Sequence, residues 1–267
     1  MFIVCAIFLG IASPGWSFFG AGKANVGPDF WNQSDEDNRR TVDHSRWDRL
    51  LQTYVVATAD SAVRQFRYTE VTPEDTTRLD GYIADMQKLD PRGYSRQEQL
   101  AFWLNLYNAV SVRAVLTHLA GRGVSAVLPE DFRTRARVKV AGQSLSLAAI
   151  EDTILRPVWQ DHRIHFGLNC ATMDCPNMDS RAYTAATVRE QLKTSGIQFI
   201  NADRGVRYAD GKLTVSRLFN IYRNDFAEDQ QMLMKVFAHY ARDMKALYLL
   251  GYTGEIFYSQ DLRLNNP

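Results

Sequence analysis

The sequence contains few cysteines and no excess of charge of either sign. Cys5, Cys170 and Cys175 are the only cysteines among the 267 residues. The formal net charge at pH 7 is +1, so the composition does not suggest the strongly basic surface that binds nucleic-acid phosphates. We therefore expect no nucleic-acid partner.

Several motifs with a defined chemistry are also missing. The Gly-Arg-Gly at 121–123 lacks the lysine and the helix context of a phosphate-binding loop. The sequence has no Gly-x-Ser-x-Gly nucleophile elbow. With 46% apolar and 23% charged residues the chain has the composition of an ordinary globular protein, and nothing in it predicts a cofactor.

The N-terminal hydrophobic run is too short to cross a bilayer as a helix. Residues 1–11 are apolar and uncharged, the length of a signal-peptide core. Cleavage after Ser17 would place Gly15 and Ser17 at the small-residue positions. We predict a signal peptide over 1–17, a flexible tether over 18–40 and one globular domain over 41–267. The mature protein would be periplasmic or secreted, with no integral membrane segment; the alternative is a buried N-terminal strand.

Helical periodicity and capping signals predict helices over most of the chain. We expect helices over residues 45–62, 72–89, 95–121, 146–155, 184–201, 216–224 and 229–246. Thr72 and Pro73 mark one start, and Ser95 with Glu98 forms a capping box at another. The helix over 95–121 is apolar over most of its circumference, which indicates a central buried helix.

Alternating patterns predict short strands between these helices. Two hairpins are expected, over 137–146 and 205–216, the second with an Asp-Gly turn. Residues 164–170 are expected to form a buried strand, and 255–264 a last one. The fold class predicted is a single α+β domain with a central buried helix, flanking helices and a small, mostly antiparallel sheet with two hairpins.

Three blocks of sequence occur in a familiar order. They are FWLNLYNA at 102–109, LSLAAIEDTILR at 145–156 and HFGLNCATMDCP at 165–176. Together they resemble the domain-of-unknown-function family 547 over about residues 90–267. Residues 258–265 look like a degenerate form of that family's C-terminal stretch, with Ser-Gln-Asp-Leu-Arg in place of a more aromatic sequence. The resemblance implies homology and fold, and no settled activity.

The third block holds one imidazole and two thiols. In a strand over 164–170, His165 and Cys170 would face opposite sides. Cys175 lies beyond that strand and precedes Pro176, so it could cap a helical turn whose N–H groups favour the thiolate; the neighbouring Asp174 opposes this. One hypothesis is therefore a cysteine-dependent hydrolase or acyl-transfer enzyme with Cys175 as nucleophile and His165 as general base.

Other residues can be assigned to that hypothetical site. Glu151 and Asn108 are candidates to orient the base. Asn105, Arg156 and Trp103 are candidates to bind a small-molecule or peptide-like substrate, Arg156 through a bidentate contact with a carboxylate. For Arg156 we favour the more common role, in which such an arginine connects a helix end to a loop. The asparagines lie three apart on one helix face, where tying down a nearby loop is the more common role.

Two other functions compete with this hypothesis, and a metal site is a further alternative. A disulfide between Cys170 and Cys175 would make the protein a non-catalytic binding module with a rigid loop. Thiol–disulfide exchange by the pair is less favoured, because the spacing is not Cys-x-x-Cys. No metal is predicted, since the usual short Cys and His spacings of zinc sites are not reproduced.

Overall fold

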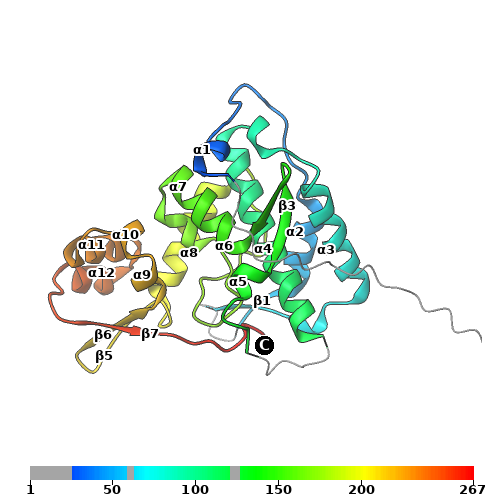
Figure 1. Cartoon of the computed structure of the whole chain (residues 1–267). Helices are drawn as coiled ribbons and strands as arrows, with labels where there is room; N and C mark the ends of the chain where they lie inside the picture. Colours follow the sequence, from blue (N-terminus) through cyan, green and yellow to red (C-terminus); the bar gives the residue numbers. More distant parts are fainter. Residues whose placement is uncertain (1–25, 59–62, 121–126) are drawn as a thin grey trace, which may run out of the picture.

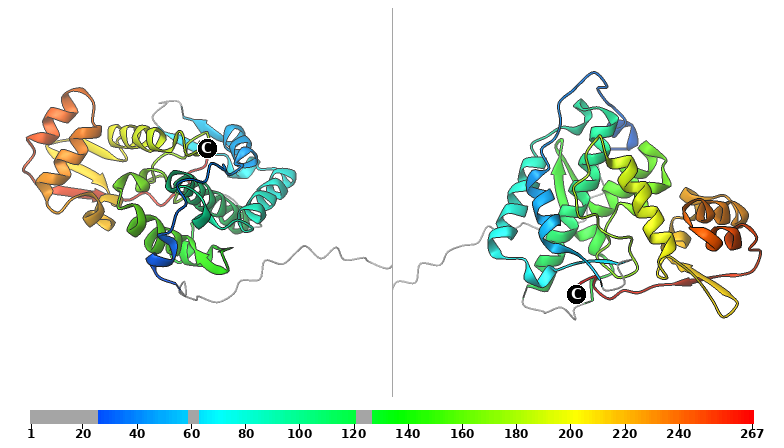
Figure 2. Two further views of the ribbon diagram at one scale, coloured as in Figure 1. Left: turned by 90° about the horizontal axis from the view of Figure 1, so that it is seen from above. Right: turned by 180° about the vertical axis from the view of Figure 1, so that it is seen from behind.

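The predicted α+β class is confirmed by a computed structural model that describes residues 26–58, 63–120 and 127–267. The predicted signal peptide and the first part of the predicted tether lie outside these residues. In the described part of the chain no helix is long and apolar enough to cross a membrane. Figures 1 and 2 show a helical body with a smaller helix-and-strand lobe beside it.

The elements have the following bounds. The helices are α1 (Pro28–Trp31), α2 (Ser45–Tyr54), α3 (Pro73–Met86), α4 (Arg96–Leu119), α5 (Phe132–Arg135), α6 (Leu147–Ala149), α7 (Arg156–Trp159), α8 (Val188–Asn201), α9 (Leu218–Ile221), α10 (Arg223–Phe226), α11 (Gln230–Tyr240) and α12 (Asp243–Leu250). Shorter helical turns are η1 (Tyr68–Glu70), η2 (Pro91–Gly93), the π-helical η3 (Ile150–Leu155) and the 3₁₀ turn η4 (His162–Phe166). The strands are β1 (Val55–Ala57), β2 (Arg64–Phe66), β3 (Arg137–Val140), β4 (Gln143–Ser146), β5 (Val206–Ala209), β6 (Lys212–Ser216) and β7 (Ile256–Ser259).

Helix α4 is the central buried helix that its apolar circumference predicted. It is buried almost continuously from Glu98 to Val112, and Figure 1 shows it surrounded by other helices. The Ser95 hydroxyl accepts a hydrogen bond from the Glu98 N–H, as the capping box requires. The Glu98 carboxylate accepts instead from the Val42 N–H at 2.7 Å, so it ties the preceding segment to the helix start.

Both predicted hairpins are confirmed. β3 pairs with β4 and β5 with β6, each antiparallel. The central turn residues Ala141 and Gly142 have φ of 46° and 79°, and Asp210 and Gly211 have 53° and 75°. Positive φ at both positions is the type I′ geometry that matches strand twist. β7 pairs with β6 in parallel, which makes this sheet mixed.

The core consists of two clusters of buried side chains. The larger one surrounds α4 and draws on residues from Trp31 to Leu192. The second joins Phe166 and α8 to the lobe of β5–β7 and α9–α12, and includes Phe219, Phe226 and Phe237. α8 packs on η4 at the junction, so the segment around His165 lies between the two clusters.

The described part of the predicted tether is anchored to the core by the side chain of Trp31, its one buried residue. Pro28 begins α1, and Trp31 is only 1% exposed. Its ring meets that of Trp103 edge to face, with centroids 5.3 Å apart. This contact fixes the segment to the body at Trp31, whereas most residues from 32 to 40 are exposed.

Several predicted elements end or fold differently. The helix predicted over 216–224 is divided into α9 and α10, and the helix predicted over 229–246 into α11 and α12. The first helix stops at Tyr54, where Val55 and Val56 begin β1, because β-branched residues favour extended backbone. The helix over 146–155 continues through Pro157, because η3 runs directly into α7. The strand predicted over 164–170 is wrong: η4 and a loop replace it. The last strand is shorter than predicted and ends at Ser259.

Candidate functional site

A cleft of about 540 Å³ opens between α5, η3, η4, α9 and the segment that follows β7. Buried and half-buried side chains line its base. Exposed apolar side chains form its rim, and the loop after η4 forms one wall. The base contains Tyr107, Arg133, Glu151, His165 and Tyr222. The rim contains Val127, Ile221 and Leu262, and the wall Cys170, Thr172 and Asp174.

His165 lies between two carboxylates at the cleft base. It is 2% exposed, and its Nε2 is 2.8 Å from Oδ2 of Asp225. Its Nδ1 faces Oε1 of Glu151 at 3.3 Å. The imidazole also stacks on the ring of Tyr222, with centroids 4.0 Å apart. Both ring nitrogens thus face acidic groups, an arrangement that holds the ring in one orientation.

Two arginines balance these carboxylates. Arg133 Nη2 donates to Oε2 of Glu151 at 2.6 Å. Arg156 contacts Asp225 through Nε and Nη2, at 2.5 and 2.9 Å, in the bidentate geometry of a strong ion pair. Burial favours the neutral form of Glu151, yet the close contact with His165 and the charge of Arg133 outweigh it and lower the pKa of Glu151. The pKa of Asp225 is lowered despite partial burial, chiefly by its bonds with Arg156 and His165.

These shifts predict acid sensitivity of the cluster. Because the folded-state pKa values of Glu151 and Asp225 lie below their usual values of 4.5 and 3.8, both groups stabilise the fold above about pH 4.5, and this contribution is lost as the pH falls through their folded-state values. We expect the free energy of unfolding, measured in urea, to decline below about pH 4.5. Asp225→Asn should flatten that decline; an unchanged slope in this variant would contradict the assignment.

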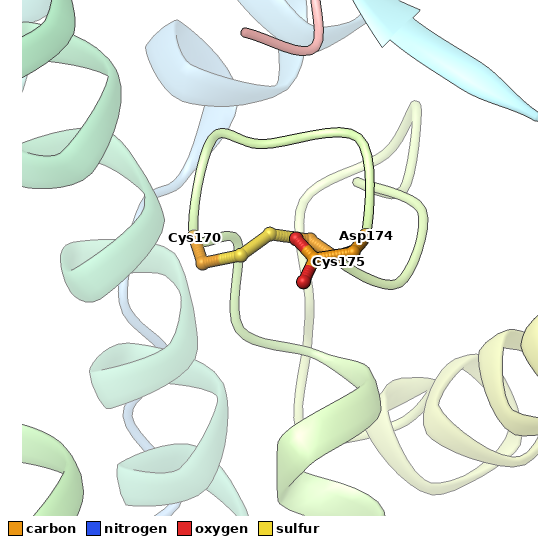
Figure 3. Close-up of side chains that lie close together, drawn as sticks. All are labelled: Cys170, Asp174 and Cys175. Atoms are coloured by element: carbon orange, nitrogen blue, oxygen red, sulfur yellow. A yellow bond between two sulfur atoms is a disulfide. The ribbon is translucent and has the colours of Figure 1, made fainter. Parts of the chain in front are cut away.

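The cysteines of the third block form a disulfide in the cleft wall (Figure 3). Their Cα atoms are 5.8 Å apart, and Ala171 adopts a left-handed φ of 66° at the start of the loop that joins them. Cys170 lines the cleft and is partly exposed, whereas Cys175 is 1% exposed. The expected free Cys175 thiolate is therefore corrected: its sulfur is bonded and buried.

A threonine and an aspartate surround the two sulfurs. The Oγ1 of Thr172 lies 3.2 Å from the Cys170 sulfur and 3.3 Å from the Cys175 sulfur, and it donates to Oδ1 of Asp174 at 2.7 Å. One oxygen of Asp174 and both sulfurs lie within 4.8 Å of one another. These three residues could ligate a metal only after reduction, since the disulfide leaves the carboxylate as the sole ionisable ligand.

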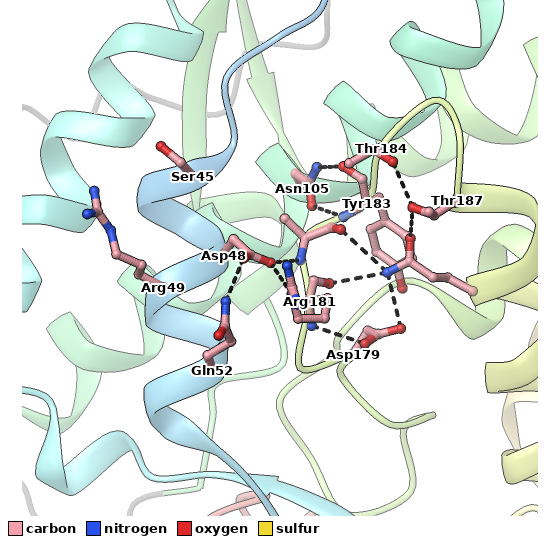
Figure 4. A network of polar contacts seen from close by, with 12 residues as sticks. Ser45, Asp48, Arg49, Gln52, Asn105, Asp179, Arg181, Tyr183, Thr184 and Thr187 are labelled. Carbon is pink, nitrogen blue, oxygen red and sulfur yellow. Dashed lines mark hydrogen bonds and ion pairs between the residues drawn. The ribbon is translucent and has the colours of Figure 1, made fainter.

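The two asparagines of α4 hold loops in place. Asn108 donates to the Gly167 carbonyl at 2.8 Å and accepts from the Asn169 N–H at 2.9 Å. Asn105 makes the same pair of bonds with the backbone of Tyr183, at 2.8 and 2.9 Å, as Figure 4 shows. Neither lines the cleft. Asn108 fixes the loop between His165 and Cys170, and Asn105 fixes a loop on another side of the body.

The remaining predicted residues divide between the cleft and the core. Glu151 lies at the cleft base beside His165. Trp103 is 1% exposed and packs in the core against Trp31. Arg156 is occupied by Asp225 and Asp152 and does not line the cleft. Neither Trp103 nor Arg156 is placed to contact a ligand there.

Sequence reasoning missed Arg133, Tyr222 and Asp225. Asp225 is 60 positions from His165 and lies on α10, in the lobe. Arg133 and Tyr222 occur outside the three blocks, in short helical segments without a distinctive pattern. Tyr107 lies within the first block, directly before Asn108, and its phenol points to Glu151 at 3.5 Å; its position in that block was the one available signal.

Comparison with known proteins finds a family match over part of the chain. Residues 91–200 match the model of the family described as "Protein of unknown function, DUF547". This range contains all three sequence blocks, α4 and the disulfide loop, and ends before the lobe. The match confirms the predicted resemblance over residues 91–200 and not over 258–265. No curated protein and no solved structure shows significant similarity to the chain.

Proposed function

We propose that the cleft binds a peptide-like ligand and that the protein is a binding module whose cleft wall is fixed by the Cys170–Cys175 disulfide. The observation that carries this proposal is the combination, in one cleft, of an exposed apolar rim and a buried, charged base. Ligand sites typically pair apolar lining with a few well-placed polar groups.

The rim supplies apolar contact surface. Val127, Ile221 and Leu262 are 66%, 57% and 51% exposed, and all three line the cleft. Single exposed apolar side chains are ordinary, but several around one cleft indicate an interaction surface. Apolar side chains of a bound peptide would cover them.

The base supplies polar groups suited to a peptide backbone. The Nε of Arg133 is buried and finds no hydrogen-bond acceptor in the described part of the chain. The Nδ1 of His165 faces Glu151 without the alignment of a hydrogen bond. A buried unpaired polar group costs about 1–3 kcal/mol, so a ligand carbonyl that accepts from the Arg133 Nε would gain affinity.

The cysteine hydrolase or acyl-transfer alternative is less well supported. It needs a free, reachable Cys175 thiolate and an imidazole nitrogen turned toward it. Burial of Cys175, its bond to Cys170 and the two carboxylates around His165 all count against that arrangement.

We also propose that the protein is exported. The apolar run over residues 1–11 and the small residues before position 18 support this. A disulfide is consistent with an oxidising compartment such as the periplasm or the exterior.

A charge at the rim should weaken binding. Ile221→Glu would place a carboxylate where a ligand side chain must lose water, and we expect it to weaken affinity about tenfold or more. The measurement is saturation-transfer NMR on a library of capped tetrapeptides, followed by titration of the best binders.

Leu247→Glu is the matched control, because Leu247 is 63% exposed on α12 and does not line the cleft. It should bind like the unaltered protein. Equal affinity in both variants, or no binding of any tetrapeptide, would refute the proposal.

A further inference from the structure

The two sulfurs of the disulfide differ in access. Cys170 lines the cleft and is partly exposed. Cys175 is 1% exposed and does not line the cleft. A thiolate that enters the cleft can therefore approach the Cys170 sulfur and not the Cys175 sulfur. Thiol–disulfide exchange depends on which sulfur can be attacked. The difference in access therefore makes Cys170 the cysteine that exchanges with an incoming thiol.

A proton path leads from the sulfurs to a carboxylate. Thr172 Oγ1 is within 3.3 Å of each sulfur and donates to Asp174. A hydroxyl that donates to a carboxylate keeps its lone pairs free, so it can accept from a thiol. Burial raises the pKa of Asp174, and the neighbouring Asp261 adds to this, although the bond from Thr172 opposes it. Asp174 is thus a suitable proton acceptor for a buried thiol.

We propose that Cys170 and Cys175 form a dithiol–disulfide exchange site for carboxylate-bearing thiols that enter the cleft, with Cys170 as the exchanging and Cys175 as the resolving cysteine. Asp174 and Thr172 act as the proton relay of the resolving step.

The reaction balances in two steps. First, the Cys170 thiolate of the reduced protein attacks a substrate disulfide R–S–S–R; a bond forms between the Cys170 sulfur and one substrate sulfur, and the other leaves as thiolate RS⁻. Second, Cys175 passes its proton through Thr172 to Asp174 and attacks the Cys170 sulfur. The bond to the substrate sulfur breaks and a second RS⁻ leaves. The protein dithiol is oxidised by two electrons and the substrate disulfide is reduced; the reverse sequence reduces the protein with two thiols.

Arg217 favours an anionic thiol. It lines the same cleft, is exposed, and bonds through Nη1 to the neutral Gln260 at 2.7 Å. It forms no ion pair with a residue in the described ranges. A carboxylate of the incoming thiol can pair with the remaining N–H donors of Arg217. The carboxylates of a cysteine-containing peptide are suited to this contact.

Oxidised glutathione is a suitable probe, since it carries both the disulfide and carboxylates. The full chain with Cys5→Ser is reduced, freed of reductant and mixed with oxidised glutathione; samples are quenched in acid and analysed by intact mass and peptide mapping. We expect one glutathione on Cys170 first, and then its loss as the internal disulfide closes. At high probe concentration this reaction needs only access to the cleft, so it can succeed even where tetrapeptide binding fails.

Single variants separate the two cysteines. Cys175→Ser should retain a stable adduct on Cys170. Cys170→Ser should form an adduct on Cys175 at least about tenfold more slowly than Cys175→Ser forms one on Cys170, because the Cys175 sulfur is buried. Equal rates in the two variants, a first adduct on Cys175 in the parent protein, or no exchange within hours would overturn the proposal.

Asp174→Asn tests the relay. We expect formation of the adduct at nearly the parent rate and its resolution about tenfold more slowly, so the adduct accumulates. A purely structural role would not separate the two steps. Glu130→Gln is the matched control, an exposed cleft carboxylate that contacts neither sulfur; accumulation in both variants, or in neither, would refute the relay.

Discussion

Glu151→Ala is expected to lower the free energy of unfolding by about 3 kcal/mol. The carboxylate is 3% exposed and faces both Arg133 and His165. Removing one member of a buried ion pair leaves its partner uncompensated, which costs about 3–5 kcal/mol. Because the Arg133 side chain is 34% exposed, water can solvate part of it and the lower end of that range applies. Urea unfolding at pH 7 measures the change.

Glu130→Ala supplies the comparison, because Glu130 lines the same cleft but is exposed. Surface changes of this kind typically stay within about 0.5 kcal/mol. If the two variants lose similar stability, Glu151 does not hold the buried cluster together as its contacts indicate.

Asn108→Ala is expected to cost about 2–5 kcal/mol, since it removes two hydrogen bonds and leaves the Gly167 carbonyl and the Asn169 N–H buried without them. The loop that they fix joins His165 to Cys170. We therefore also expect faster reduction of the disulfide by dithiothreitol in this variant. Thermal unfolding and the reduction rate are the two measurements.

Asn220→Ala removes an exposed asparagine side chain on α9 and is the control for losing a side-chain amide. It should leave both the thermal stability and the reduction rate unchanged. An Asn108→Ala protein as stable as this control would mean that the loop is held by other contacts.

Local signals were sufficient to predict much of the fold. Thr72 and Ser95 accept the N–H bonds of their first helical turns, as capping chemistry requires. Asp210 and Gly211 form the turn expected of their pair. In each case the determining interaction lies within a few residues, so the sequence alone contains it.

The segment from Ile164 to Cys170 shows where this reasoning fails. Its short apolar run fits a buried strand as well as a buried helical turn, and periodicity cannot separate the two. Phe166 enters the second core cluster and Asn108 clamps the following loop. These tertiary contacts select η4, and the sequence pattern does not contain them.

Only part of the candidate site could be predicted from the sequence, because tertiary contacts determine the rest. His165, Glu151 and the cysteine pair stand out because reactive residue types are concentrated in the blocks. The role of His165, however, depends on Asp225 and Tyr222, which reach it from the lobe. The loop between the two cysteines begins with left-handed backbone at Ala171, which a non-glycine residue rarely adopts, so the sequence does not predict the shape of this loop.

The state of the Cys175 sulfur distinguishes a cleft with a disulfide wall from a cysteine-nucleophile enzyme most directly. The measurement is alkylation of the native full chain with Cys5→Ser by iodoacetamide, without reductant, followed by peptide mass spectrometry. We predict no label on Cys170 or Cys175, and complete labelling of both after reduction and unfolding. A labelled Cys175 in the native protein would contradict this and restore the nucleophile hypothesis.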